Sequence, residues 1–192
     1  MSGEPRRKGP ARKKRWDEFS PLEQEVAKSG MGRTGYFVLM WVAGLELVGE
    51  FSRAEEGILG GVVTPGFIFS TTSLVGYLGL YWAARAGVRM ASLFGILMSG
   101  SFAMLCLSDW ALGEANGRNI RQAIYFSIAL LIFIGSTRAL GRLKRQGELA
   151  EAFPEAEDRL LFAVFGFLCV MVGWVMVIVM SVFAELGGDG ST

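Results

Sequence analysis

Five long apolar segments constrain the fold of this chain more than any other feature. Leu, Ile, Val, Phe, Met, Ala and Gly dominate them, and they cover residues 36–51, 65–84, 90–107, 120–137 and 160–184. Most approach the ~20 residues that a helix needs to cross ~30 Å of hydrocarbon. The first does so once it is extended over 34–52, because each helical residue adds about 1.5 Å of rise. The sequence therefore predicts an all-α, polytopic integral membrane bundle of five transmembrane helices over residues 34–186.

The 19 Lys and Arg residues are distributed unevenly around these segments. Nine precede the first segment, two lie in the second connection and five in the fourth, whereas the other connections carry only Arg53, Arg118 and Arg121. Loops rich in Lys and Arg stay in the cytoplasm. The distribution thus predicts a cytoplasmic N-terminus and, after five crossings, an external C-terminus. A plasma or inner membrane is the expected location, with an organellar membrane as the alternative.

The segments that flank the bundle have simpler expected roles. Residues 1–19 are rich in charge, Gly and Pro, which is typical of a disordered cytoplasmic arm. Ser20, Pro21 and Glu23 form a capping-box pattern, so residues 20–33 are expected to hold a short interfacial helix and a linker. Residues 187–192 are expected to form a flexible external tail.

The basic residues of the arm are predicted to set topology and to contact anionic lipid or a partner. They are Arg6, Arg7, Lys8, Arg12, Lys13, Lys14 and Arg15. No aromatic side chains are interleaved with them, so specific nucleic-acid recognition is not expected.

The absence of histidine limits the chemistry available to the chain. A Ser-His-Asp relay, an HExxH zinc site and a His-ligated haem are all excluded. The two cysteines, Cys106 and Cys169, both lie in apolar segments, where a thiol acts as a small hydrophobic group. We therefore expect no metal site and no enzymatic activity, with a lipid-directed enzyme that uses a carboxylate base as a minor alternative. No cofactor is indicated.

The second apolar segment carries clear helix signals and a run of hydroxyl groups. Thr64 and Pro65 have the pattern of an N-cap followed by the first helical residue. Four hydroxyl side chains follow, and they cover more than one helix face: Ser70, Thr71, Thr72 and Ser73. These groups serve either helix packing or the lining of a hydrated path.

Small residues spaced four apart predict close helix contacts. Gly95, Ser99 and Ala103 form such a row in the third segment, and Cys169 and Gly173 form one in the fifth. The spacing does not distinguish a neighbouring helix of the same chain from another subunit.

Glu46 and Glu50 are the most functional-looking residues of the sequence. They share one face of the first membrane helix, and Glu46 lies about 9 Å inside the external end if that helix ends near Ser52. Possible partners at this level are Arg53, Arg121 and the hydroxyl of Thr64, with Asp109 as a possible additional acid. Glu46 is then either a structural partner of Arg121 or part of a site for a proton, a cation or a polar substrate.

The fourth connection, 138–159, contains only helix-end signals. Gly141 and Gly147, with the basic residues between them, predict a basic end to the fourth helix, and residues 153–158 predict an acidic first turn of the fifth.

The preferred hypothesis is a non-enzymatic accessory or assembly subunit of a membrane complex, which acts through helix–helix contacts. The alternative is a small oligomeric transporter or channel for a proton, cation or polar solute, which uses Glu46 and the 70–73 hydroxyl tract. Expected partners are the lipid bilayer and either other membrane subunits or further copies of this chain.

Overall fold

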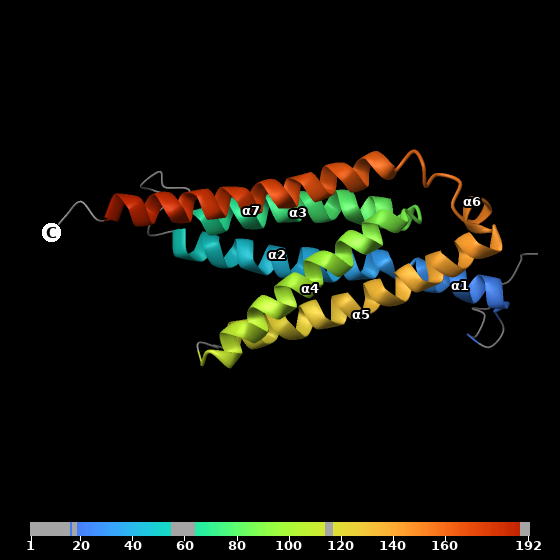
Figure 1. Cartoon of the computed structure of the whole chain (residues 1–192), viewed down its shortest axis with the longest axis horizontal. Coiled ribbons are helices and arrows are strands. Elements are labelled where there is room, and N and C mark those ends of the chain that lie inside the picture. Colours follow the sequence, from blue (N-terminus) through green and yellow to red (C-terminus); the bar gives the residue numbers. More distant parts are fainter. Residues whose placement is uncertain (1–15, 17–18, 55–63, 114–116, 189–192) are drawn as a thin grey trace, which may run out of the picture.

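Helices make up all the regular structure that is described for this chain (Figure 1). The computed structural model describes Trp16 and residues 19–54, 64–113 and 117–188, without the side chains of residues 53–54, 109, 118–119, 181 and 184–188. The helices are α1 (Pro21–Ser29), α2 (Gly32–Ala54), α3 (Pro65–Arg85), α4 (Arg89–Ala111), α5 (Gly117–Gln146), α6 (Leu149–Ala152) and α7 (Leu160–Gly188).

Five spans in the described residues are long and apolar enough to cross a membrane, which confirms the predicted helical class. The first of them runs through α1 and α2, and the others lie in α3, α4, α5 and α7. The basic arm at residues 6–15 lies outside the described residues, as does most of the tail at 187–192.

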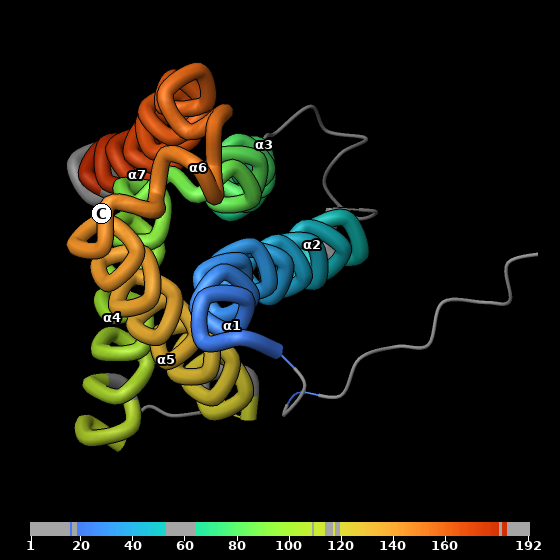
Figure 2. The backbone as a smooth tube through the Cα atoms, turned by 90° about the vertical axis from the view of Figure 1, so that its right-hand side faces the viewer, coloured from blue at the N-terminus to red at the C-terminus, as the bar shows by residue number. Residues whose placement is uncertain are grey.

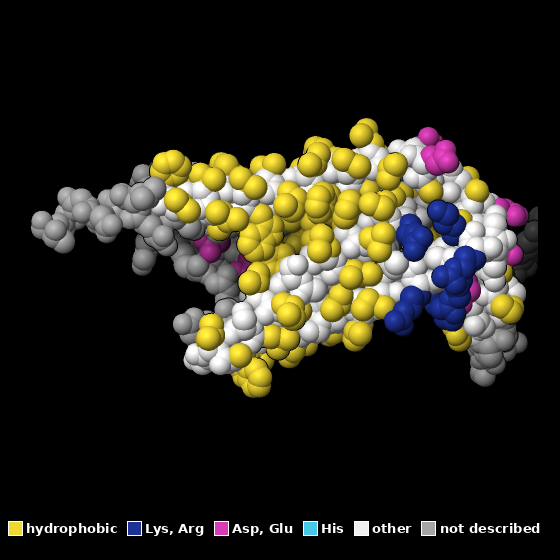
Figure 3. Space-filling model, in the orientation of Figure 1, with side chains coloured by type: hydrophobic (Ala, Val, Ile, Leu, Met, Phe, Trp, Pro, Cys, Tyr) yellow, Lys and Arg dark blue, Asp and Glu magenta, His cyan; other side chains and the backbone are white. Residues whose placement is uncertain are grey.

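The long helices form two pairs that α2 connects. α3 packs along α7, α4 packs along α5, and α2 contacts both α3 and α5 (Figures 1 and 2). Exposed basic residues cluster at one end of the bundle, which we call the basic end: Arg85, Arg89, Arg138, Arg142, Lys144 and Arg145 (Figure 3). The opposite end is the one at which α2 finishes and α3 begins.

The close approach of α3 and α7 depends on glycine. A Cβ atom added to Gly76 would lie 2.6 Å from the carbonyl oxygen of Gly166, and one added to Gly166 would lie 2.5 Å from that of Gly76. Gly173 faces Thr72 in the same interface. Small residues let membrane helices approach to backbone contact. These glycines therefore serve the packing of two helices of the same chain.

A second glycine contact joins α2, α4 and α5. The fully buried ring of Phe133 lies against both Gly35 and Gly95, where added Cβ atoms would meet it at 2.7 and 2.5 Å. The Tyr36 ring packs on Phe133 at 4.6 Å between centroids, and its hydroxyl donates to the carbonyl oxygen of Ala91. Gly95, the first residue of the predicted row of small residues in α4, thus packs against another helix of the same chain.

At the basic end, α1 docks on α5. The capping box is confirmed, since Ser20 N–H donates to Glu23 at 2.7 Å and Glu23 N–H donates to Ser20 Oγ at 3.2 Å. Ser136 Oγ donates to the carbonyl of Ser29 at 2.7 Å, and Arg142 pairs with Glu25 at 3.2 Å. The linker expected before residue 34 is shorter than predicted, because α2 begins at Gly32.

The fourth connection agrees with its prediction in part. Gly141 lies inside α5, and the helix ends instead before Gly147, which adopts φ +78°. The predicted basic last turn is present as Lys144 and Arg145. The acidic residues of 153–158 precede the first turn of α7 rather than forming it, and a short unpredicted helix, α6, lies before them.

Candidate functional site

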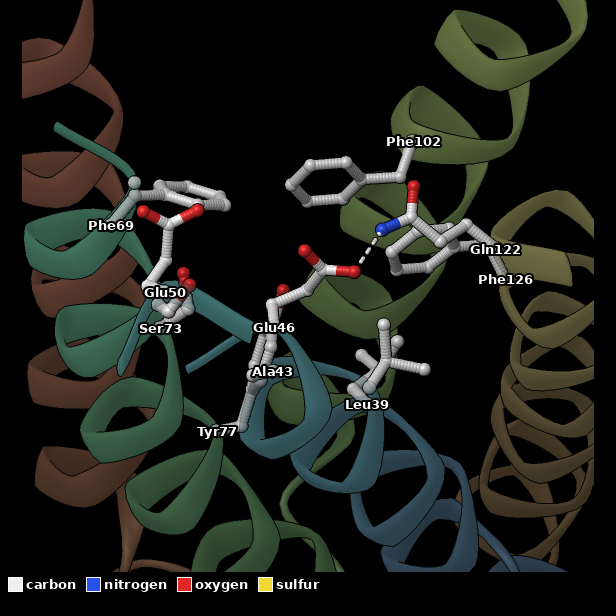
Figure 4. Close-up of a pocket in the computed structure, with 13 residues that line it drawn as sticks. Leu39, Ala43, Glu46, Glu50, Phe69, Ser73, Tyr77, Phe102, Gln122 and Phe126 are labelled. Carbon is white, nitrogen blue, oxygen red and sulfur yellow. Dashed lines mark hydrogen bonds between the residues drawn. The ribbon is translucent and has the colours of Figure 1, made fainter. Parts of the chain in front are cut away.

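A cavity of about 150 Å³ lies between α2, α3, α4 and α5 toward the opposite end. It is large enough for several water molecules. Its lining consists of Leu39, Val42, Ala43, Glu46 and Glu50 of α2, Gly66, Phe69, Ser70, Ser73 and Tyr77 of α3, Phe102 of α4, and Gln122 and Phe126 of α5 (Figure 4). In the space-filling view, acidic atoms are visible in a hollow on the side away from the basic end (Figure 3).

Glu46 faces α5 across this cavity. Its Oε1 accepts a hydrogen bond from Nε2 of Gln122 at 2.6 Å, as the dashed line in Figure 4 shows. With α2 ending at Ala54, Glu46 lies about 12 Å of helical rise before the end of its helix. This hydrogen bond joins α2 and α5 at a level far from the basic end of the bundle.

Glu50 faces α3 and is held at the start of that helix. Thr64 caps α3 by accepting from the Phe67 N–H at 3.1 Å, which confirms the predicted N-cap, and its hydroxyl donates to Glu50 Oε2 at 2.9 Å. A Cβ on Gly66 would lie 2.8 Å from the Glu50 carboxyl carbon, so glycine leaves the room that this group occupies. The positive end of the α3 dipole favours a carboxylate there.

The four hydroxyl residues of α3 separate into two groups. Ser70 and Ser73 are buried and line the cavity, and Ser73 Oγ has no hydrogen-bond partner within the described part of the chain. Thr72 donates to the carbonyl of Ile68 at 2.9 Å and lies toward α7. The buried hydroxyl of Thr71 does not belong to the cavity lining.

Aromatic rings form much of the remaining wall. Phe102 stacks on Phe126 with 4.8 Å between centroids, and Phe69 lies 5.9 Å from Phe102. Trp174 of α7 packs against both Phe69 and Phe102, at 5.5 and 5.3 Å, and so supports the wall from behind. These mutual contacts hold the ring positions because aromatic pairs favour stacked and tilted geometries.

The remaining predicted site residues lie elsewhere. Arg121 is exposed, and its Nε donates to the carbonyl of Gly117 in its own helix at 3.2 Å. Its neighbour in α5, Gln122, donates a hydrogen bond to Glu46. The side chains of Arg53 and Asp109 are not described, and the basic residues of the arm lie outside the described residues.

Sequence reasoning missed Gln122, Gly66 and the aromatic wall. Gln122 carried a usable signal, since a glutamine in an apolar helix is expected to hydrogen-bond to a neighbouring helix. Nothing in the local sequence indicates that Phe69, Phe102 and Phe126 face one space, because their helices meet only in the tertiary structure.

The apolar helices and the charged end define a multi-pass integral membrane protein. No protein family, curated protein or solved structure matches the chain.

Proposed function

We propose that this protein binds a small organic cation of the ammonium class in the cavity, as a step in its transport across the membrane. The observation that carries the proposal is the convergence of Glu46, Glu50 and Ser73 on one aromatic-walled cavity, where the Ser73 hydroxyl has no hydrogen-bond partner among the described residues. Ionisable residues within membrane helices are functional candidates by default. The role is binding and movement of a solute, without chemical conversion of it.

The charge of the lining favours a cation. The lining residues Glu46 and Glu50 each carry a carboxyl group that can contact a cation. The hydroxyl of Ser73 and the carbonyl oxygen of the Gln122 amide add neutral acceptors. A positively charged solute is therefore the best electrostatic match.

The aromatic wall favours an organic cation over a metal ion. The faces of aromatic rings attract ammonium groups within about 6 Å, and Phe69, Phe102, Phe126 and Tyr77 all line the cavity. Calcium instead takes 6–8 oxygen ligands, and magnesium keeps several of its waters. Rings that cover so much of the wall suit a cation with apolar substituents.

The arrangement of the core supports a transporter more than an open channel. Toward the basic end of the cavity, Tyr36, Leu80 and Phe133 are each 0% exposed and fill the space between helices. A transporter keeps one side of its site closed while the other is open. We place the N-terminus in the cytoplasm and the site in the external half of a plasma or inner membrane, following the basic residues.

Isothermal titration calorimetry of the purified protein in neutral detergent tests this function. We expect tetramethylammonium to bind and uncharged tert-butanol not to bind. Glu46→Gln is expected to weaken tetramethylammonium binding about tenfold or more while the fold is retained, because the amide keeps shape and hydrogen bonding without the charge. Glu151→Gln, on exposed α6, is the matched control. Equal binding by wild type and Glu46→Gln, or binding of tert-butanol, would overturn the proposal.

An accessory subunit is the second candidate, and one observation favours it. An apolar groove of about 550 Å³ runs between α4 and α5, lined in part by Cys106, Trp110, Ser127 and Leu131. A helix of a partner subunit fits such a groove. Gly76, Gly95, Gly166 and Gly173, however, already lie against other helices of this chain. A stoichiometric partner that co-purifies with wild type and is lost in Ser127→Phe would support this role.

A further inference from the structure

We infer that the basic end carries a binding site for the phosphate headgroup of an anionic phospholipid, between the end of α3 and the start of α7. A cavity of about 390 Å³ lies there, lined by Trp82, Arg85, Phe153, Glu155, Arg159 and neighbouring small residues. It is separate from the solute cavity, and the inference does not depend on the proposed function.

Two guanidinium groups line this cavity, one from the end of α3 and one from the turn before α7. Arg85 is the last residue of α3, and Arg159 immediately precedes α7. Guanidinium groups bind phosphate oxygens through paired N–H donors. Arg85 has no ion pair within the described part of the chain, and Arg159 meets Glu155 at 3.6 Å. The cavity thus offers two cationic groups against one carboxylate.

Contacts with aromatic rings hold both arginines in place. Arg85 Cζ lies 5.3 Å from the centre of the Trp82 ring, and Arg159 Cζ lies 5.3 Å from that of Phe162. In these contacts the flat face of each guanidinium group lies against the ring. The N–H groups at its edge can therefore still donate hydrogen bonds to a ligand.

The wall opposite the arginines is anchored to the bundle. The Phe153 ring lies where a side chain of Gly87 would be, and Gly87 adopts φ +75° in the turn between α3 and α4. This conformation is available to glycine at little cost. The segment before α7 is therefore fixed against the end of α3, and the cavity exists without a ligand.

The site lies where a headgroup would be. Arg85 ends one candidate membrane span, and Arg159 lies next to the start of another, at Leu160. Beyond it, the outer face of α7 exposes apolar side chains, among them Leu161 and Val164. Trp82 is 42% exposed, as is usual for tryptophan at membrane interfaces. An acyl chain can follow α7 while its phosphate contacts the two arginines.

Calorimetry on the full chain in neutral detergent tests the inference, with dioctanoyl phosphatidylglycerol as the probe. We expect it to bind about tenfold or more tightly than dioctanoyl phosphatidylcholine or inorganic phosphate. The double variant Arg85→Gln/Arg159→Gln should lose about tenfold or more in affinity for phosphatidylglycerol. Arg89→Gln/Arg138→Gln, which removes two exposed charges from the same end but outside the cavity, should keep it.

Glu155→Gln provides an independent readout that leaves both arginines in place. Removal of its exposed carboxylate should tighten phosphatidylglycerol binding about twofold to fivefold, since a competing ion pair is lost. Unchanged affinity in the double arginine variant, or an equal loss in the Arg89→Gln/Arg138→Gln control, would overturn the site. Inorganic phosphate that binds as tightly as the lipid would show a general anion site and overturn the lipid assignment.

Discussion

Two glutamates on one face of α2 have different surroundings, and the proposed function gives them different roles. Glu50 is 9% exposed and is fixed by the Thr64 hydroxyl, the space at Gly66 and the start of α3. Glu46 lies deeper along the helix and meets an amide of α5. We therefore assign to Glu50 the joining of α2 and α3 as well as charge in the cavity, and to Glu46 the main contact with the solute.

Variants of Thr64 test the proposed role of Glu50 in joining α2 and α3. Thr64→Ala removes both the N-cap of α3 and a donor to Glu50, so it should lower the free energy of unfolding by about 1–2 kcal/mol. Thr64→Ser keeps the hydroxyl and should restore most of the loss. Denaturant unfolding in mixed micelles measures both. A Thr64→Ala protein as stable as wild type would show that the cap and the Glu50 contact contribute nothing.

Ser73 tests the proposed solute binding, because the change Ser73→Ala should affect stability and solute affinity in opposite directions. Its buried hydroxyl has no partner among the described residues, so Ser73→Ala should leave stability unchanged or raise it. If the Ser73 hydroxyl accepts a hydrogen bond from a bound ammonium group, the same change should weaken binding of a primary ammonium by up to about tenfold. Thermal melting and calorimetry separate the two effects. Full affinity in Ser73→Ala would exclude this hydroxyl from the site.

At the scale of the helices, local signals were readable from sequence and tertiary ones were not. The caps at Ser20 and Thr64 were predicted because a cap is a pattern of a few adjacent residues. The end of α5 was predicted less well, since Gly141 and Gly147 are both plausible stops. Arg142 and Ser136 contact α1, and these long-range contacts support the extended helix. The identity of Gln122 as the partner of Glu46 depends likewise on how α5 is rotated against α2.

The α3–α7 interface is predicted to depend on backbone contact. Gly76→Ala would place a Cβ 2.6 Å from the Gly166 carbonyl oxygen, so we expect destabilisation of about 1–3 kcal/mol. Gly135→Ala is the matched control, since nothing lies within 4 Å of its added Cβ. The control should change stability by no more than about 1 kcal/mol, in the stabilising direction. Similar losses in both variants would assign the effect to helix propensity and contradict close packing.

For the whole molecule, the concentration of basic side chains at one end supports the proposed orientation (Figure 3). The sequence predicted the five apolar helices because length and hydropathy are local properties. It could not predict which helices pair, since the exposed and buried faces of a membrane helix are both apolar. The cavity follows from that pairing, which is why only its acidic and hydroxyl residues were anticipated.

Orientation has its own test. A reporter active only outside the cytoplasm should work when it is fused after Thr192, whereas one placed at Gly147 should remain inside. Five crossings would put the two sites on opposite sides of the membrane, and the positions of the basic residues favour Gly147 on the inside. Reporters that lie on the same side would contradict the five-helix topology.

The presence of a cation between the two glutamates is the central claim, and anomalous diffraction tests it most directly. Crystals of the protein grown with tetramethylarsonium, a scattering analogue of tetramethylammonium, should show an anomalous peak beside the Glu46 and Glu50 carboxylates and the rings of Phe102 and Phe126. The peak should vanish in Glu46→Gln/Glu50→Gln crystals. An empty cavity in wild type, or an undiminished peak in the double variant, would contradict the account.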